Sequence, residues 1–240
     1  MKAESDVQEK TFVRHEADRY FRRMHDAMID PGYRTLDPAL FLIKKAGFKP
    51  KQVLEIGCSI GWRLDALHKL YNSQCLGIEP SREAIREGRK LYKNVEFRRG
   101  ICKSLPIAQT KTFDLVIVYY VLHWISRESL FKSLAEIDRV VADGGHLILA
   151  DFLPNGPTKV PYHHLPDQEI FTFKLDYAQL FKDTGLYREK RRVVYNHRTW
   201  AHATRLPPEI RGYCTVLQKS NGGFYKTQSL KKYPWLKPKK

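Results

Sequence analysis

The chain has 240 residues, 42% of them hydrophobic, and a formal net charge of +16, which suits one α/β domain large enough to bury a full core. Its four cysteines lack the paired spacing of metal ligands, which argues against a zinc site or a disulfide framework, so we expect no metal. No apolar run reaches the length of a membrane span, and the first residues lack the apolar centre of a signal peptide, so we expect a cytosolic protein.

Basic residues concentrate in three segments, residues 82–103, 188–192 and 226–240. The resulting positive surface potential favours anionic partners, such as a nucleic acid or a phosphorylated or nucleotide-linked small molecule. Solvated helix faces and a disordered tail explain the same charges without any partner. The charge alone therefore leaves both interpretations open.

Apolar side chains recur at helical spacing near the N-terminus and predict a helix over residues 7–29. The next residues, Asp30-Pro31-Gly32, end that helix. Asp37-Pro38 begins a second helix, which extends through residue 45 and has proline in its first turn. The N-terminal region is therefore predicted to be helical.

A turn built of small residues follows the first predicted strand. Residues 51–56 form a short apolar run, the turn contains Gly57, Ser59 and Gly61, and residues 62–70 continue at helical spacing. Such a turn lets the backbone approach a ligand closely, because no side chain prevents it.

Three chemistries use a strand, turn and helix of this kind. A dinucleotide fold needs Gly-x-Gly-x-x-Gly, and the third glycine is missing here. Residues 57–61 match the Gly-x-Ser-x-Gly of a hydrolase elbow, but that elbow normally follows several strands and only one precedes it here. In the third chemistry a carboxylate after the next strand, residues 75–78, binds a ribose, and Glu79 stands at that position.

Strands and helices alternate after this turn, which indicates a parallel sheet covered by helices on both faces. One predicted helix begins at the N-cap Ser126 and ends at Gly144-Gly145. The other predicted elements are strands over residues 95–98, 115–118, 146–152, 190–195 and 213–218 and a helix over residues 176–185.

Two segments are expected at the carboxyl edge of this sheet, where open α/β folds bind ligands. Tyr119, Tyr120 and His123 follow the predicted strand 115–118. Residues 152–175 contain four prolines, which exclude a long helix, and a loop of this length is usually functional or disordered. Its aromatic residues and paired histidines argue against disorder, so we predict a substrate lid.

The acids before the turn and after the second strand, Glu55 and Glu79, form a pattern that resembles the class I S-adenosylmethionine-dependent methyltransferase superfamily. The resemblance continues through Gly100-Ile101-Cys102 and the later strands and covers about residues 50–150. It implies an α/β fold: a Rossmann-like, doubly wound, seven-stranded and mostly parallel sheet with an antiparallel last strand.

The same resemblance implies an organisation into three parts. N-terminal helices over residues 1–50 would form a cap, and residues 51–220 would form the methyltransferase domain with its lid at about 152–175. The remaining residues, 221–240, would be a basic tail.

S-adenosyl-L-methionine is the cofactor that the resemblance implies. It places the ribose on Glu79 and the adenine beside the loop after the third strand, where Ile101 replaces an acid that is common in the superfamily. Tyr20 would reach the methionine end from the cap. The residues expected to bind the cofactor are Glu55, Gly57, Cys58, Ser59, Gly61, Glu79, Pro80, Ile101, Cys102, Tyr119 and Tyr20.

Methyl transfer from a sulfonium is a one-step in-line displacement, and the protein's main contribution is to hold donor and acceptor in line. A hydroxyl acceptor must lose a proton, for which a histidine is suited, whereas an amine acceptor needs no such base. His163 and His164 are the first candidates for this base, followed by His123 and Asp167. The residues expected to contact the acceptor are Tyr120, Tyr162 and Asp167.

We predict a methyltransferase that acts on a small or sugar-like acceptor carrying an anionic group, such as a phosphate or nucleotide. Methylation of RNA or DNA is an alternative, although the chain has neither an Asp-Pro-Pro-Tyr motif nor a catalytic Pro-Cys pair. A non-catalytic binding protein that keeps the cofactor fold is a second alternative, which Ser59 and Ile101 leave open. The sequence predicts neither the acceptor atom nor the oligomeric state.

Overall fold

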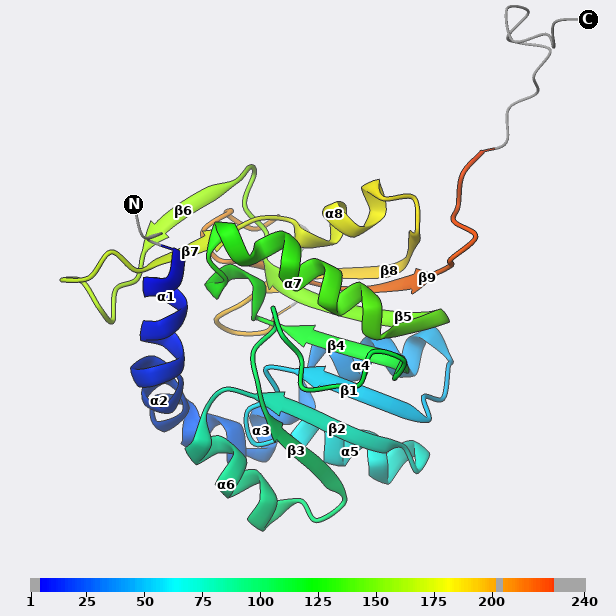
Figure 1. Cartoon of the computed structure of the whole chain (residues 1–240), viewed down its shortest axis with the longest axis horizontal. Coiled ribbons are helices and arrows are strands. Elements are labelled where there is room, and N and C mark those ends of the chain that lie inside the picture. Colours follow the sequence, from blue (N-terminus) through cyan, green and yellow to red (C-terminus); the bar gives the residue numbers. More distant parts are fainter. Residues whose placement is uncertain (1–4, 202–204, 227–240) are drawn as a thin grey trace, which may run out of the picture.

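The computed structural model describes residues 5–201 and 205–226. The strands of its main sheet are β1 (Gln52–Ile56), β2 (Gln74–Glu79), β3 (Val95–Arg99), β4 (Phe113–Tyr119), β5 (Val141–Phe152), β8 (Tyr187–Asn196) and β9 (Arg211–Lys219). They follow the order β3-β2-β1-β4-β5-β9-β8 (Figure 1). β9 pairs antiparallel with both of its neighbours, and all other pairs in this sheet are parallel. The predicted fold class is confirmed.

Helices cover both faces of this sheet. They are α1 (Ser5–Thr11), α2 (Ala17–Ile29), α3 (Pro31–Thr35), α4 (Pro38–Ala46), α5 (Trp62–Tyr71), α6 (Arg82–Leu91), α7 (Arg127–Val140) and α8 (Tyr177–Asp183), with a π-helical segment η1 (Phe12–Glu16) and a 3-10 turn η2 (Leu122–Trp124). Successive strand residues point to opposite faces. Leu115 and Ile117 therefore pack with residues of α2, α4, α5 and α6, whereas Val116 and Val118 pack with residues of α7 and α8.

The boundary between α7 and β5 differs from the prediction. α7 ends at Val140 and β5 begins at the next residue, so the predicted helix end at Gly144-Gly145 is wrong. Gly144 instead adopts a left-handed φ of 73° within β5, in the segment where the pairing of β4 with β5 changes register. Glycine permits this irregularity as readily as it permits a helix end, so the pattern did not distinguish the two.

The predicted lid contains a hairpin of two antiparallel strands, β6 (Thr158–Pro161) and β7 (Phe171–Lys174). The predicted N-terminal helix is divided into α1, η1 and α2, and α1 lies near the hairpin (Figure 1). The side-chain amide of Gln8 on α1 donates to the carbonyl oxygens of Trp124 at 2.7 Å and of Phe171 at 3.1 Å. The N-terminal helices and the hairpin are therefore held together.

The division into cap, domain and tail stays a prediction. Within residues 1–50, α4 packs against β8 and β9, whereas α1 contacts the lid. Residues 227–240 of the predicted tail lie outside the described residues.

All four cysteines are unpaired and buried. No helix in the two described ranges is long and apolar enough to cross a membrane.

Candidate active site

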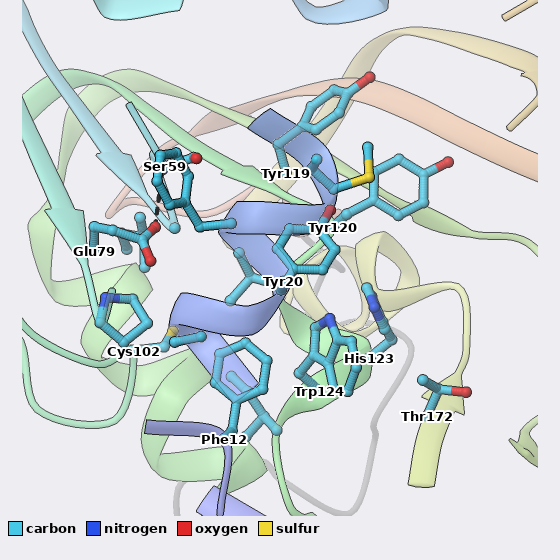
Figure 2. Close-up of a pocket in the computed structure, with 18 of the residues that line it drawn as sticks. Phe12, Tyr20, Ser59, Glu79, Cys102, Tyr119, Tyr120, His123, Trp124 and Thr172 are labelled. Carbon is cyan, nitrogen blue, oxygen red and sulfur yellow. Dashed lines mark hydrogen bonds between the residues drawn. The ribbon is translucent and has the colours of Figure 1, made fainter. Parts of the chain in front are cut away.

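A cavity of about 750 Å³ opens at the carboxyl edge of the parallel strands. Its wall comes from the turn after β1, the ends of β2, β4 and β5, the segment α1 to α2, and the β6–β7 hairpin. Figure 2 shows Glu79 and Cys102 on one side of this cavity and His123 and Thr172 on the other, with Tyr20 between them. The cavity thus has room for two ligands placed side by side.

Nearly all predicted site residues meet in this cavity. The predicted residues in its wall are Tyr20, Glu55, Gly57, Cys58, Ser59, Glu79, Pro80, Ile101, Cys102, Tyr119, Tyr120, His123, Tyr162, His163 and His164. Gly61 does not line it, because it faces the Phe97 ring, which a Cβ at Gly61 would meet at 2.6 Å. Asp167 does not line it either and is exposed to solvent.

The turn after β1 has a backbone that favours glycine. Gly57 has a φ of 74° and Ser59 a φ of 48°. A Cβ on Gly57 would lie 2.4 Å from a methyl group of Val121, so a larger residue does not fit. The Cys58 thiol packs against β2, where a Cβ on Gly77 would come within 2.4 Å of its sulfur. The turn therefore presents mainly backbone to the cavity.

Ser59 does not have the surroundings of a hydrolase nucleophile. Its hydroxyl donates to the sulfur of Met28 at 2.9 Å. In the part of the chain that the structure describes, no histidine forms a hydrogen bond with this hydroxyl. A serine nucleophile needs an adjacent base, so the match to the hydrolase elbow carries no function here.

Glu79 is held at the cavity wall by the backbone on either side of it. Its two carboxylate oxygens accept hydrogen bonds from the N–H of Ser59 at 2.8 Å and of Ser81 at 2.9 Å. Burial raises the pKa of Glu79 to about 7, against the opposing effect of these two hydrogen bonds. Each oxygen keeps a further lone pair, so the carboxylate can accept from two neighbouring hydroxyls.

Glu55 lies deeper and belongs to a buried ion-pair network. Arg63 on α5 donates to Glu55 and, at 2.9 Å, to Asp37 at the N-cap of α4. Burial raises the pKa of Glu55 to about 7, and Arg63 opposes this shift. The second carboxylate oxygen of Glu55 is buried and has no hydrogen-bond partner among the described residues. The Arg63 guanidinium also lies 4.2 Å from the centroid of the Tyr119 ring and supports this part of the wall.

His123 follows β4 and lies against a carboxylate at the end of β5. Its Nδ1 is 3.0 Å from Oδ1 of Asp151, and its backbone N–H donates to the other oxygen at 3.2 Å. Both side chains are buried. Tyr120 and Phe152 make edge contacts with the imidazole ring. The carboxylate thus lies against one ring nitrogen of the imidazole, although this Nδ1 forms no hydrogen bond among the described residues.

His163 and His164 lie in the exposed turn between β6 and β7. Their rings are 3.9 Å apart, and the pKa of His164 is lowered by desolvation and by nearby Arg23. Tyr162 is fixed more firmly, because its hydroxyl donates to Glu16 at 2.5 Å and accepts from Arg23 at 2.7 Å. The predicted pair of histidines is therefore at the rim of the cavity, whereas His123 is in its interior.

Three further residues of the site were not predicted. Trp124 and Lys174 line the cavity, and the Asp151 carboxylate lies 3.0 Å from the His123 ring. Asp151 could have been identified from the sequence, since it is an acid at the carboxyl end of an otherwise apolar strand. Nothing in the sequence marks Trp124 or Lys174, because turns and hairpins place many such residues at the surface.

Comparison with known proteins agrees with this geometry. Residues 54–149 match the family model described as a methyltransferase domain. A demethylmenaquinone methyltransferase of Bacteroides fragilis is 30% identical over 111 residues, which are 43% of this chain and 44% of that protein. A norajmaline N-methyltransferase of Rauvolfia serpentina is 27% identical over 150 residues, 54% of this chain and 50% of that protein. The chain thus spans about half the length of these curated relatives.

Solved structures share the fold over most of the chain. The N-methyltransferase NodS from Bradyrhizobium japonicum, in complex with S-adenosyl-L-homocysteine, has a TM-score of 0.57 at 14% identity and covers 90% of this chain and 97% of its own. A protein from Pyrococcus horikoshii has a TM-score of 0.61 at 19% identity and covers 84% of this chain and 99% of its own. At such identities the likeness concerns the fold alone.

The matched segment extends from β1 to β5 and contains the turn after β1 and Glu79. It thus includes the central strands of the sheet and one side of the cavity. Residues 54–149 therefore match a methyltransferase domain, which agrees with the predicted superfamily.

Proposed function

We propose that this chain is an S-adenosylmethionine-dependent methyltransferase whose acceptor is a small molecule. Glu79 carries the proposal: it is a buried carboxylate in the cavity wall, fixed by two backbone N–H groups beside a turn without large side chains. A carboxylate after the second strand of a doubly wound sheet is suited to bind both hydroxyls of a ribose.

The cavity residues fit the rest of this cofactor. The free, buried oxygen of Glu55 suits the ammonium group of the methionine part, because an ammonium would satisfy its missing hydrogen bond. Phe12 and Ile101 supply apolar surface for an adenine ring on the Glu79 side of the cavity. When bound, the cofactor supplies an electrophilic methyl group on a positively charged sulfur.

The chain's own residues would position the acceptor and accept its proton. The aromatic side chains of Tyr120, Trp124 and Phe152 line the cavity beside His123 and would limit the access of water to the acceptor. For a hydroxyl acceptor, His123 would take the proton on the ring nitrogen that does not face Asp151, and Asp151 would stabilise the resulting imidazolium. An amine acceptor would need only the positioning.

The shape of the site supports a small acceptor over a nucleic acid. The cavity is partly covered by α1 to α2 and by the hairpin, and away from Glu79 its wall includes the rings of Tyr120, Trp124 and Phe152. Two of the curated relatives are named for demethylmenaquinone and norajmaline, which are both small molecules. The net charge of +16 is consistent with an anionic acceptor and does not by itself require nucleic acid.

Calorimetry with S-adenosylhomocysteine, the demethylated product, tests the cofactor assignment. Glu79→Gln should weaken binding by at least about a hundredfold, since each hydrogen bond to a charged group contributes about 1.5–3 kcal/mol and a tenfold change is about 1.4 kcal/mol. Glu83→Gln is the matched control, because Glu83 pairs with Arg22 at the surface and does not line the cavity. Unchanged affinity in Glu79→Gln would contradict the assignment.

Transfer of a labelled methyl group tests the activity itself. The protein is incubated with methyl-labelled S-adenosylmethionine and separately with small hydroxyl compounds, small amines and RNA. Label in a small compound supports the proposal, and label in RNA supports the alternative. Cofactor binding without transfer to any class would support the non-catalytic binding protein.

A further inference from the structure

Beyond His123 the cavity is bounded by Phe152 and by one face of β7. Thr172 and Lys174 alternate along this strand and both line the cavity, and Figure 2 shows Thr172 near His123. Phe173, between them, lies beneath the guanidinium of Arg127. The strand period of two therefore directs the Lys174 side chain into the cavity.

The Lys174 ammonium lies over an aromatic ring. Its Nζ is 4.3 Å from the centroid of the Phe152 ring, and the other contacts of this ring include His123 at 4.9 Å and His197 at 4.9 Å between centroids. Desolvation lowers the pKa of Lys174, and Arg198 lowers it further, whereas Asp151 and Glu209 oppose the shift. The ammonium is thus held in a site where its charge is partly desolvated.

Three other cations of the cavity wall have a carboxylate partner, whereas Lys174 and Arg198 form no ion pair among the described residues. The pairs are Arg23 with Glu16, Arg63 with Asp37 at 2.9 Å, and Lys103 with Glu9 at 2.7 Å. Lys174 forms no ion pair with any carboxylate among residues 5–201 and 205–226. Asp151 and Glu209 are near enough to raise the pKa of Lys174 but form no ion pair with it, so an anionic ligand in contact with the ammonium would supply a closer counter-ion.

We propose that Lys174 binds an anionic group of the methyl acceptor, with Arg198 beside it at the rim; this inference rests on the proposed function. The acceptor is a molecule with a flat, apolar body that carries one carboxylate or phosphate. The flat body is indicated by the rings of Tyr120, Trp124 and Phe152, which bound this part of the cavity. Because Phe152 contacts both Lys174 and His123, the anionic group and the methylated atom lie close together in the acceptor.

Binding of small probes to the full chain saturated with S-adenosylhomocysteine tests this inference. Benzoate and phenyl phosphate carry the two possible anions, and benzamide has the shape of benzoate without its charge. A charged hydrogen bond is worth about a tenfold to hundredfold change in affinity. At least one anion should therefore bind the wild type tighter than benzamide by this factor, in a titration followed by nuclear magnetic resonance.

Three variants assign the preference to the side chain. Lys174→Met should abolish it, because methionine keeps the apolar stem and removes the charge, and Lys174→Arg should retain it. Lys159→Met is the matched control, since Lys159 is an exposed lysine on the neighbouring strand whose ammonium lies over Phe171 outside the cavity. No preference in the wild type, or a preference that survives in Lys174→Met, would overturn the inference.

Affinity for S-adenosylhomocysteine separates this inference from the proposed function. All three variants should bind it as the wild type does, because Lys174 lies on the far side of the cavity from Glu79. If the wild type does not bind it, the proposed function fails, and the probe titration without it still decides whether Lys174 binds anions.

Discussion

Replacement of Arg63 by methionine tests whether the wall of the cavity depends on the buried ion-pair network. The guanidinium donates to Glu55 and, at 2.9 Å, to Asp37, and the three side chains are only 8%, 1% and 3% exposed. Removal of one partner of a buried ion pair costs about 3–5 kcal/mol, because the remaining charge stays buried. Urea denaturation of Arg63→Met should therefore give a free energy of unfolding that is lower by about 3–5 kcal/mol. This is a large part of the about 5–15 kcal/mol by which a domain is stable.

Arg22→Met is the matched control for this substitution. Arg22 also pairs with a glutamate, Glu83, but its side chain is 63% exposed, so the free energy of unfolding should change little. Arg63→Lys retains a charge and should lose less stability than Arg63→Met. Equal losses in Arg63→Met and Arg22→Met would refute the reasoning.

The pH dependence of the loss gives a second check on the network. Burial raises the pKa of Glu55 from the ordinary 4.5 to about 7 even with Arg63 present. A carboxyl whose folded pKa is raised contributes stability below about pH 4.5 that is lost as the pH rises through about 7. Without Arg63 the folded pKa rises further, so Arg63→Met should be more harmful at alkaline than at acidic pH. A loss independent of pH would contradict the titration of Glu55.

Three further predictions concern the cavity. The affinity for S-adenosylhomocysteine should increase as the pH rises through about 7, where Glu79 ionises, and calorimetry of Glu79→Gln should show a flat dependence. With a hydroxyl acceptor, His123→Asn should lower kcat by about a hundredfold to ten-thousandfold without changing cofactor affinity, whereas a larger effect of His164→Asn would favour the rim histidines as base. Gly57→Ala should destabilise the chain more than Gly144→Ala in thermal denaturation. Both glycines have a positive φ, which costs roughly 1–2 kcal/mol for alanine. Of the two positions, only 57 has a neighbouring side chain 2.4 Å from the new Cβ.

Local patterns in the sequence were sufficient to predict the sheet and the cofactor side of the cavity. The runs that became β1, β2 and β4 are buried on both faces, which favours apolar side chains at most of their positions. Gly57 and Glu79 stand at fixed distances along the chain from these strands, and the parallel sheet brings strand ends together. The cofactor residues were therefore predictable from order and spacing.

The acceptor side depended on contacts between segments far apart in the chain. Asp151 and His123 come from different strand ends, and Lys174 reaches Phe152 only because β6 and β7 pair and α1 holds the hairpin through Gln8. No local pattern in the sequence reports contacts between segments so far apart. The sequence therefore favoured the exposed His163 and His164 over the buried His123 as the base. The sequence by itself determined the alternation of strands and helices, the turn of small residues after the first strand and the carboxylate after the second, because these follow from burial and spacing along the chain. Only the tertiary structure decided which base and which cation face the acceptor, because that choice depends on how the N-terminal helices and the hairpin pack across the edge of the sheet.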